Sequence, residues 1–265
     1  MKNSLINILN QDNGILRLTL DDENNKNALS EAMISELTEA INAANDNKEV
    51  KVIIIASNGN VFCSGHNLKE ITAARNNNDK GESYFMNLFE LCSALMQLIV
   101  SCSKPVIAEV DGIATAAGCQ LVASCDLAIS SSTAKFATPG VNIGLFCSTP
   151  MVALSRNVSK KEAMKMLLTG DMIDAVEAKR ISLINDYVSD DKLEESVNNL
   201  ALKISKKSSV TVKIGKEAFY KQAEMSLSDA YAYTSVVMAQ NTLNDDAKEG
   251  ISSFIEKRDP NWQDN

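Results

Sequence analysis

The stretch KPVIAEVDGIATAAGCQLVASCDLAIS, residues 104–130, decides the fold that we predict for this chain. It predicts an apolar strand over residues 105–110, a turn at Asp111-Gly112, small residues leading into a helix, and a strand over residues 127–130. A strand that restarts as Ala-Thr-Ala-Ala-Gly presents several backbone N–H groups at a helix N-terminus, where an anion or an oxyanion can bind. Small residues also let a helix pack closely on a sheet, so this stretch alone leaves both interpretations open.

Strands and helices alternate on both sides of this stretch. Residues 4–9 and 14–20 flank Asp12-Asn13-Gly14 and predict a hairpin, and Ser30 can cap a helix that runs to about residue 44. The continuous apolar run at residues 50–56 is typical of a strand buried on both faces. Residues 61–71 form a second passage from a strand through a glycine turn into a short helix. The pattern predicts an α/β fold.

The chain becomes almost entirely helical after residue 190. We therefore predict an α/β core over residues 1–190 and a helical region over residues 191–265, which packs on the core or on a neighbouring subunit. No internal repeat and no low-complexity linker separates the two parts.

Composition excludes several classes of function. The chain has 265 residues, is 45% hydrophobic and carries a net charge of −8, which argues against binding to nucleic acid or to an anionic membrane. Its longest apolar run is strand-sized, so we expect no membrane span. Six scattered cysteines and a single histidine give no metal-ligand spacing, so we expect no metal site. The start, MKNSLINILN, lacks a signal-peptide or transit-peptide pattern, and we expect a cytoplasmic protein.

Five motifs in order carry a resemblance to a known family. They are VFCSGHNLKEI (61–71), DGIATAAGCQLVASCDLAIS (111–130), AKFATPGVNIGL (134–145), DAVEAKRISLINDYV (174–188) and FIEKRDPNW (254–262). Together they resemble the crotonase, or enoyl-CoA hydratase/isomerase, superfamily over essentially the full chain, and most of all its mitochondrial-type enoyl-CoA hydratase domain-containing proteins. The resemblance implies a crotonase-like spiral of ββα repeats. It also implies a C-terminal helical region that builds a homotrimer or a dimer of trimers.

The resemblance also implies a site for an acyl-CoA or enoyl-CoA thioester. Members of the family hold the thioester oxygen with two backbone N–H groups, which correspond here to those of His66 and Ala117. Coenzyme A enters as part of the substrate, and no other cofactor is implied. The positions that match substrate or CoA contacts are Ser64, Gly65, Asn67, Leu68 and Gly118, with Phe254 and Lys257 reaching the CoA of a neighbouring subunit.

The sequence departs from the family at the two positions where hydratases carry glutamates. Gln120 and Gly140 stand there instead. Glutamine can orient a water but cannot take its proton, and glycine has no side chain. Because loss of an acid or base typically costs roughly 10²- to 10⁴-fold in rate, we do not expect efficient hydration by the usual mechanism.

Other residues are weighed as substitutes for the missing acids, each beside a structural interpretation. A carboxylate on an apolar strand, Glu109, is either a buried base or a solvated residue at an edge, and Asp126 is either an acid or a turn residue. His66 could titrate near neutral pH, although the family uses its backbone. The remaining candidates are Cys119, Cys147 and Ser148, of which Cys147 stands next to a helix start that would favour a thiolate, while cysteine is also a common core residue.

Two functions from different classes remain open. One is an enzyme of lyase or isomerase type that acts on an acyl-CoA through a retained oxyanion hole. The other is a non-catalytic acyl-CoA binding or regulatory protein. A dinucleotide-binding domain is disfavoured because no GxGxxG follows the first strand.

Overall fold

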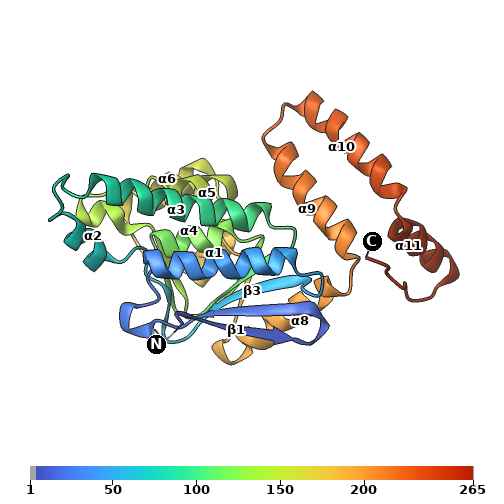
Figure 1. The fold of residues 1–265 in the computed structure, drawn as a ribbon, viewed down its shortest axis with the longest axis horizontal. Coiled ribbons are helices and arrows are strands. Elements are labelled where there is room, and N and C mark those ends of the chain that lie inside the picture. The colour runs from blue at the N-terminus through green and yellow to red at the C-terminus, as the bar shows by residue number, and fades with distance from the viewer. Residues whose placement is uncertain (1–3, 265) are drawn as a thin grey trace.

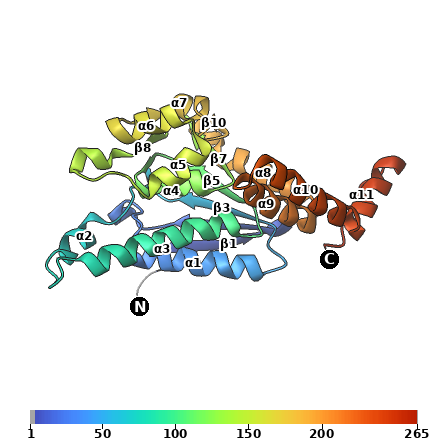
Figure 2. The same cartoon turned by 90° about the horizontal axis from the view of Figure 1, so that it is seen from above.

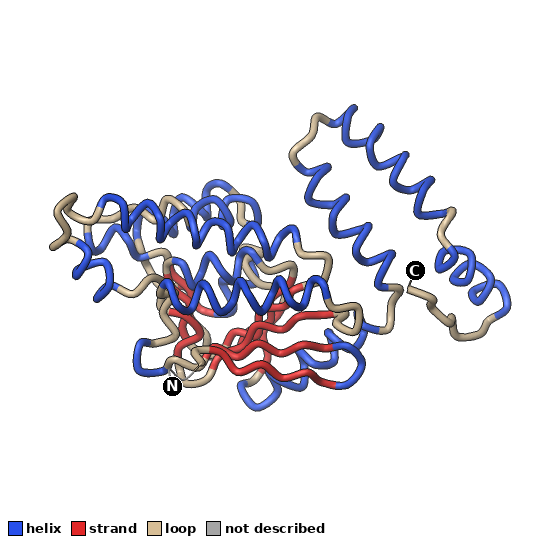
Figure 3. Tube along the Cα trace, viewed as in Figure 1, coloured by secondary structure: helices blue, strands red, loops and turns tan. Residues whose placement is uncertain are grey.

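The computed structural model describes residues 4–264 and is built around a six-stranded sheet (Figures 1 and 3). The hairpin β1–β2 is antiparallel, and the remaining strands of this sheet pair in parallel. The strand order is β1 (Ile6–Gln11), β2 (Ile15–Leu20), β3 (Val52–Ser57), β5 (Val106–Val110), β7 (Leu127–Ser131) and β10 (Asp186–Val188). The predicted hairpin and the buried strand are both confirmed.

A smaller sheet lies beside the large one. Its strands, in order, are β4 (Val61–Cys63), β6 (Ile113–Thr115), β8 (Lys135–Ala137) and β9 (Ile173–Asp174). Three times the chain runs through a strand of the large sheet and then the next strand of the small sheet, as β3–β4, β5–β6 and β7–β8. The predicted spiral of ββα turns is confirmed, and it places the carboxyl ends of β4 and β6 side by side.

Helices cover both faces of the large sheet (Figures 1 and 2). On one face lie α1 (Glu31–Asp46), α3 (Glu82–Ser101) and α4 (Ala117–Ser124), and on the other lies α8 (Leu193–Ser205). Strand β3 contributes Ile53 and Ile55 to the first core and Ile54 to the second, which is the double burial that its continuous apolar run predicts. The smaller sheet and α4 are flanked by α5 (Pro150–Asn157), α6 (Lys160–Thr169) and α7 (Ala175–Arg180).

Side chains cap the starts of several helices, among them the predicted start at Ser30. Ser30 accepts a hydrogen bond from the Met33 N–H at the start of α1, and Asp174 accepts one from the Glu177 N–H at the start of α7. Ser159 caps α6 in the same way. Each cap satisfies one of the N–H groups that a helix start leaves without a partner.

Three C-terminal helices extend away from the sheets (Figures 1 and 2). They are α9 (Ser209–Ala223), α10 (Leu227–Thr242) and α11 (Asp245–Glu256). The division of the chain at residues 190 and 191 stays a prediction, and α8, on the C-terminal side of that division, packs against the sheet through Leu193 and Val197.

Helix α3 is long and apolar enough to cross a membrane by length and composition alone. Its buried side chains, among them Leu88, Leu95 and Ile99, belong to the main core, and the helix packs against α1 and α4. In this structure α3 therefore packs on the main core through one face.

Candidate functional site

The two glycine passages that the sequence singled out lie against each other at the ends of β4 and β6. The Thr115 hydroxyl donates a hydrogen bond to the Ser64 carbonyl oxygen across 3.1 Å. Gly65 has a φ of +92°, and a Cβ added to it would lie 3.2 Å from the Ala117 nitrogen. A Cβ at Gly118 would lie 2.1 Å from the Cys63 carbonyl oxygen, so only glycine allows the backbones to approach this closely.

Two backbone N–H groups at this contact have no acceptor. Ala117 is the first residue of α4, so its N–H has no partner within the helix. Neither this N–H nor that of His66 donates a hydrogen bond to any residue that the structure describes. The φ of Ala117 is negative, so alanine replaces the family's glycine there without strain.

Backbone strain is found one residue earlier, at Ala116. This residue precedes α4 with φ 51° and ψ −118°, a conformation that an alanine rarely adopts. Its N–H donates to the Ala137 carbonyl oxygen across 3.0 Å, which ties the turn to the end of β8. Such outliers typically cost about 1–3 kcal/mol and concentrate at functional sites. The sequence motifs pointed only to the neighbouring Ala117, and no signal in the sequence indicated this strain.

Buried polar atoms without a partner gather on the segments around the two N–H groups. They are Nε2 of His66, Oε1 of Gln120 in the first turn of α4, and the hydroxyl oxygen of Thr138 after β8. Gln120 is 4% exposed and Thr138 is 1% exposed. Folded proteins pair nearly all such groups, so three exceptions on these segments call for an explanation such as a ligand. No sequence signal pointed to Thr138.

The imidazole of His66 is fixed by its surroundings. Its Nδ1 lies 3.1 Å from the Leu29 carbonyl oxygen, and its ring meets Phe89 edge-on with centroids 5.4 Å apart. A carbonyl oxygen only accepts hydrogen bonds, which places the proton on Nδ1 of the neutral ring. Burial lowers the pKa of this imidazole, so the ring is neutral at pH 7.

Gly140 lies in a short 3-10 helix, Pro139–Ile143, and its missing side chain leaves no free space. A Cβ added to Gly140 would lie 2.8 Å from the Leu145 carbonyl oxygen and 2.9 Å from Cys147 Sγ. The other family acid position, Gln120, is on α4. Exposed apolar side chains follow Gly140 along the chain at Ile143, Leu145 and Phe146.

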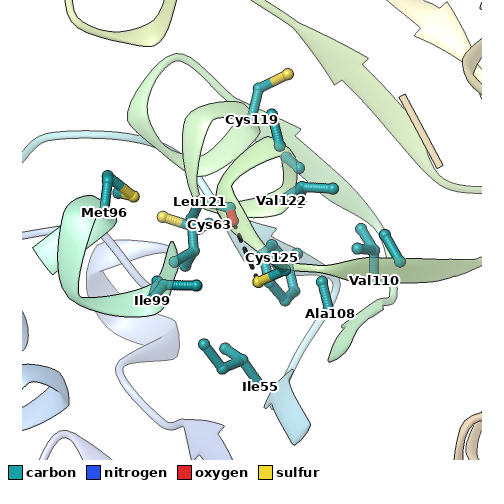
Figure 4. Close-up of a cluster of buried hydrophobic side chains, with 14 of the residues drawn as sticks. Ile55, Cys63, Met96, Ile99, Ala108, Val110, Cys119, Leu121, Val122 and Cys125 are labelled. Atoms are coloured by element: carbon teal, nitrogen blue, oxygen red, sulfur yellow. Dashed lines mark hydrogen bonds between the residues drawn. The ribbon is translucent and has the colours of Figure 1, made fainter. Parts of the chain in front are cut away.

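The cysteine candidates are buried thiols. Burial raises the pKa of Cys119 to about 12. It also raises the pKa of Cys147, although a hydrogen bond from the Gly140 backbone opposes the shift. Of the two interpretations of Cys147, these observations therefore favour the core residue, because burial outweighs the helix terminus. Figure 4 shows Cys63, Cys119 and Cys125 among apolar side chains around α4.

Glu109 lies on β5 of the large sheet and pairs with Arg17 of β2 across the intervening strand β3. The guanidinium donates from both terminal nitrogens to both carboxylate oxygens, across 2.7 and 2.8 Å, and one of these nitrogens also bonds to Asn198 of α8. The side chains of the pair are 9% and 12% exposed. Glu109 is neither a free base nor a solvated edge residue, because Arg17 occupies both of its oxygens.

Asp126 joins the core to the C-terminal helices. Its carboxylate accepts from Lys216 Nζ across 2.6 Å, from the Tyr220 hydroxyl across 2.9 Å and from the Val106 N–H across 2.7 Å. Lys216 and Tyr220 are both on α9. These contacts support a structural role for Asp126 instead of a role as an acid. The Ser148 hydroxyl is exposed, and among the described residues it bonds only to the Phe146 carbonyl oxygen.

The positions that match CoA contacts fall into two separated groups. Asn67 caps the short helix α2 (Leu68–Ala74) by accepting from the Lys69 N–H, and Leu68 is exposed beside it. Phe254 and Lys257 are at the end of α11, which lies at the opposite end of the molecule from α2 in both views (Figures 1 and 2). Within one chain they do not meet the first group. Across residues 4–264, no group of three or more histidine, cysteine or acidic side chains could hold a metal ion.

Comparisons with known proteins agree with this architecture. The family model described as enoyl-CoA hydratase/isomerase matches residues 10–265. The chain belongs to this family. Enoyl-CoA hydratase domain-containing protein 3 from Xenopus laevis is 48% identical, covering 99% of this chain and 87% of that protein. A crystal structure of the human protein of that name has a TM-score of 0.92 at 44% identity, covering 97% of this chain and 100% of that one. A crystal structure of an enoyl-CoA hydratase from Mycobacterium smegmatis has a TM-score of 0.93 at 42% sequence identity. The match covers 98% of this chain and 99% of that one.

The comparisons confirm the resemblance and correct one expectation. The crotonase fold and the enoyl-CoA hydratase/isomerase family were both predicted from the five motifs. The expected cytoplasmic location is wrong. The relatives from Xenopus laevis, Rattus norvegicus, Mus musculus, Homo sapiens and Danio rerio are all named mitochondrial, which points to mitochondria instead.

Proposed function

We propose that this chain binds an acyl-CoA thioester and polarises its carbonyl oxygen with the backbone N–H groups of His66 and Ala117. The observation that carries the proposal is the close approach of Gly65 to the Ala117 nitrogen, with both N–H groups left without an acceptor. Two preorganised donors stabilise an oxygen as it gains charge, by roughly 3–4 kcal/mol each when single donors are removed in other enzymes.

The chain is a poor hydratase in this proposal. Water addition needs a base at the water and an acid at the α-carbon, and Gln120 and Gly140 supply neither. Space for a carboxylate at residue 140 is filled by the Leu145 backbone and Cys147. His66 is neutral, with Nδ1 held by Leu29 and Nε2 buried, so it does not replace the lost acid.

The apolar residues after Gly140 favour a thioester with an apolar acyl group. Ile143, Leu145 and Phe146 are each more than 40% exposed and follow the position of the second family acid. Covering such side chains with an acyl chain removes apolar area from water at about 25 cal/mol per Å².

A non-catalytic acyl-CoA binding protein is the second candidate. The closed space at Gly140 favours it, because the Leu145 backbone and Cys147 leave no room for an acid at this position. The two candidates share the carbonyl contact and differ only in whether a proton moves after binding.

Calorimetry with matched ligands tests the carbonyl contact. Butyryl-CoA is compared with S-butyl-CoA, a thioether that has no carbonyl oxygen. We expect the thioester to bind about tenfold more tightly, as two net hydrogen bonds of about 0.5–1.5 kcal/mol each imply. The infrared carbonyl band of bound butyryl-CoA should also move to lower frequency. Equal affinities with an unshifted band would refute the contact.

Proton exchange and hydration then separate the two candidates. An enzyme exchanges the α-protons of butyryl-CoA with deuterium from D₂O, or hydrates crotonyl-CoA, whereas a binding protein does neither at saturating protein. The matched variant Gln120→Glu restores one carboxylate without changing the length of the side chain and should raise hydration. If no CoA thioester binds at all, both candidates fail.

A further inference from the structure

The peptide group between Gly65 and His66 carries one of the two proposed donors, and it follows a glycine that cannot be replaced. A Cβ on Gly65 would lie 2.9 Å from the Ala116 Cβ and 3.1 Å from the Thr115 carbonyl oxygen. Glycine is also the residue that restrains the chain least, so the peptide plane after it is free to rotate. A donor for an oxyanion must point in a fixed direction. Another part of the molecule must therefore hold this plane.

Leu29 holds this peptide group on the side opposite its N–H. The Leu29 N–H donates to the Gly65 carbonyl oxygen across 2.8 Å, and Leu29 and His66 form a parallel bridge. The C=O and N–H of a trans peptide point in opposite directions. The His66 N–H is therefore directed away from Leu29, and it meets no acceptor among residues 4–264. The bond to the Gly65 oxygen also polarises the peptide group and strengthens its N–H as a donor.

The imidazole of His66 adds a second bond to the same anchor. Its Nδ1 lies 3.1 Å from the Leu29 carbonyl oxygen, so Leu29 donates to the peptide group before His66 and accepts from the His66 side chain. This contact requires the proton on Nδ1. The two bonds close a ring, and a rotation of the peptide plane would strain or break one of them. Nε2 takes no part in the ring, because it is buried without a partner in the described chain.

Leu29 is itself firmly held. Its side chain is 0% exposed in the main core, and it directly precedes Ser30, which caps α1. The Ser64 N–H donates to the Lys26 carbonyl oxygen across 3.2 Å, so the segment before α1 holds the end of β4 at a second point. The start of α1 therefore sets the position of the peptide group that carries the donor.

We propose that the side chain of His66 is a positioning residue, which fixes the direction of its own backbone N–H by bonding through Nδ1 to Leu29. This inference rests on the proposed function, because the N–H is one of the two donors to the thioester oxygen. The other donor needs no such side chain. Ala117 begins α4, and the carbonyl oxygen of its peptide group, that of Ala116, accepts from the Gln120 N–H across 3.0 Å.

Three variants test the role of Nδ1, each measured with butyryl-CoA and with S-butyl-CoA. His66→Ala keeps the backbone N–H and removes Nδ1, whereas His66→Asn keeps an N–H donor at the δ position and removes Nε2. Phe89→Leu weakens the packing of the ring and leaves His66 intact. We expect the preference for the thioester to fall about threefold in His66→Ala, because one of two hydrogen bonds is weakened. The infrared shift of the bound carbonyl should also shrink there, and the other two variants should keep both signals.

The parent chain separates this inference from the proposed function. A parent chain without thioester preference and without band shift refutes the proposed function, and the positioning role with it. If the parent shows both signals and His66→Ala keeps them, only the positioning role fails. It also fails if His66→Asn loses as much as His66→Ala, which assigns the effect to Nε2, or if Phe89→Leu does, which assigns it to packing.

Nitrogen-15 NMR of the ligand-free parent chain tests the ring of bonds without any thioester and without any variant. The single histidine of the chain gives one pair of imidazole signals. We expect Nδ1 to carry the proton at pH 7 and Nε2 to carry none. A proton on Nε2 alone would overturn the proposal, because Nδ1 could then not donate to Leu29.

Discussion

The sulfur of Cys147 lies where the side chain of residue 140 would begin. A Cβ on Gly140 would approach Cys147 Sγ to 2.9 Å and the Leu145 carbonyl oxygen to 2.8 Å, both closer than real Cβ contacts. At a position where hydratases of the family carry an acid, this chain therefore has a packed contact. A carboxylate cannot be restored there by changing Gly140 alone.

The first prediction concerns this contact. We expect Gly140→Ala to lower the free energy of unfolding by about 1–3 kcal/mol, since it overpacks a filled space. Cys147→Ala removes the sulfur. The double variant Gly140→Ala/Cys147→Ala should therefore lose less free energy of unfolding than the sum of the losses in the two single variants. Urea unfolding measures all three. The control Gly215→Ala, on α9 with nothing within 4 Å of the added carbon, should stabilise by about 0.5–1 kcal/mol. Strict additivity of the pair would contradict the packing argument.

Local patterns predicted much of this fold, and contacts between distant residues set the rest. Ser30 caps α1 as expected, because a cap depends on residues three positions apart, and Ser159 and Asp174 cap α6 and α7 in the same way. The pairing of Arg17 with Glu109 joins residues 92 positions apart, so no local pattern could show that this carboxylate is occupied.

The candidate site was also predictable only where local motifs define it. The motifs located both glycine passages and the positions of Gln120 and Gly140. They could not reveal the strain at Ala116, whose N–H bonds to the end of β8, or the contact between Gly140 and Cys147, which depends on how the loop after β8 folds back.

The second prediction uses the strained turn before α4. Glycine adopts the φ of 51° and ψ of −118° found at Ala116 without the steric cost of a Cβ. We therefore expect Ala116→Gly to stabilise the chain by about 1 kcal/mol. The matched variant Ala117→Gly changes a neighbour with negative φ and should destabilise by about 0.5–1 kcal/mol. Thermal unfolding of both variants gives the sign, and destabilisation by both would remove the argument for strain.

The third prediction concerns the ion pair under α8. Glu109→Gln removes the close countercharge of the buried guanidinium of Arg17 and leaves it only the exposed carboxylate of Glu194 at 3.9 Å, so we expect a loss of about 3 kcal/mol in the free energy of unfolding. Glu195→Gln breaks an exposed pair with Lys192 and should change stability by less than about 1 kcal/mol. Affinity for butyryl-CoA should not change in either folded variant. A large loss of that affinity in a stable Glu109→Gln protein would show that Glu109 acts at the site.

The last prediction follows from the buried thiols. Burial raises the pKa of Cys63, Cys92 and Cys119 to about 12, from about 8.5 in an unfolded chain. Between these values the unfolded state releases the thiol protons and the native state retains them, so stability is complete below about pH 8.5 and falls as pH rises toward 12. Each such thiol should reduce the free energy of unfolding by about 1.4 kcal/mol per pH unit in that range. Urea unfolding at pH 7, 9 and 10 measures the slope, and Cys119→Ala should reduce this slope by the contribution of one thiol.

These thiols should also resist alkylation at pH 8 until denaturant is added. Labelling of the native chain at the rate of a free thiol would show that they are not held as the structure has them.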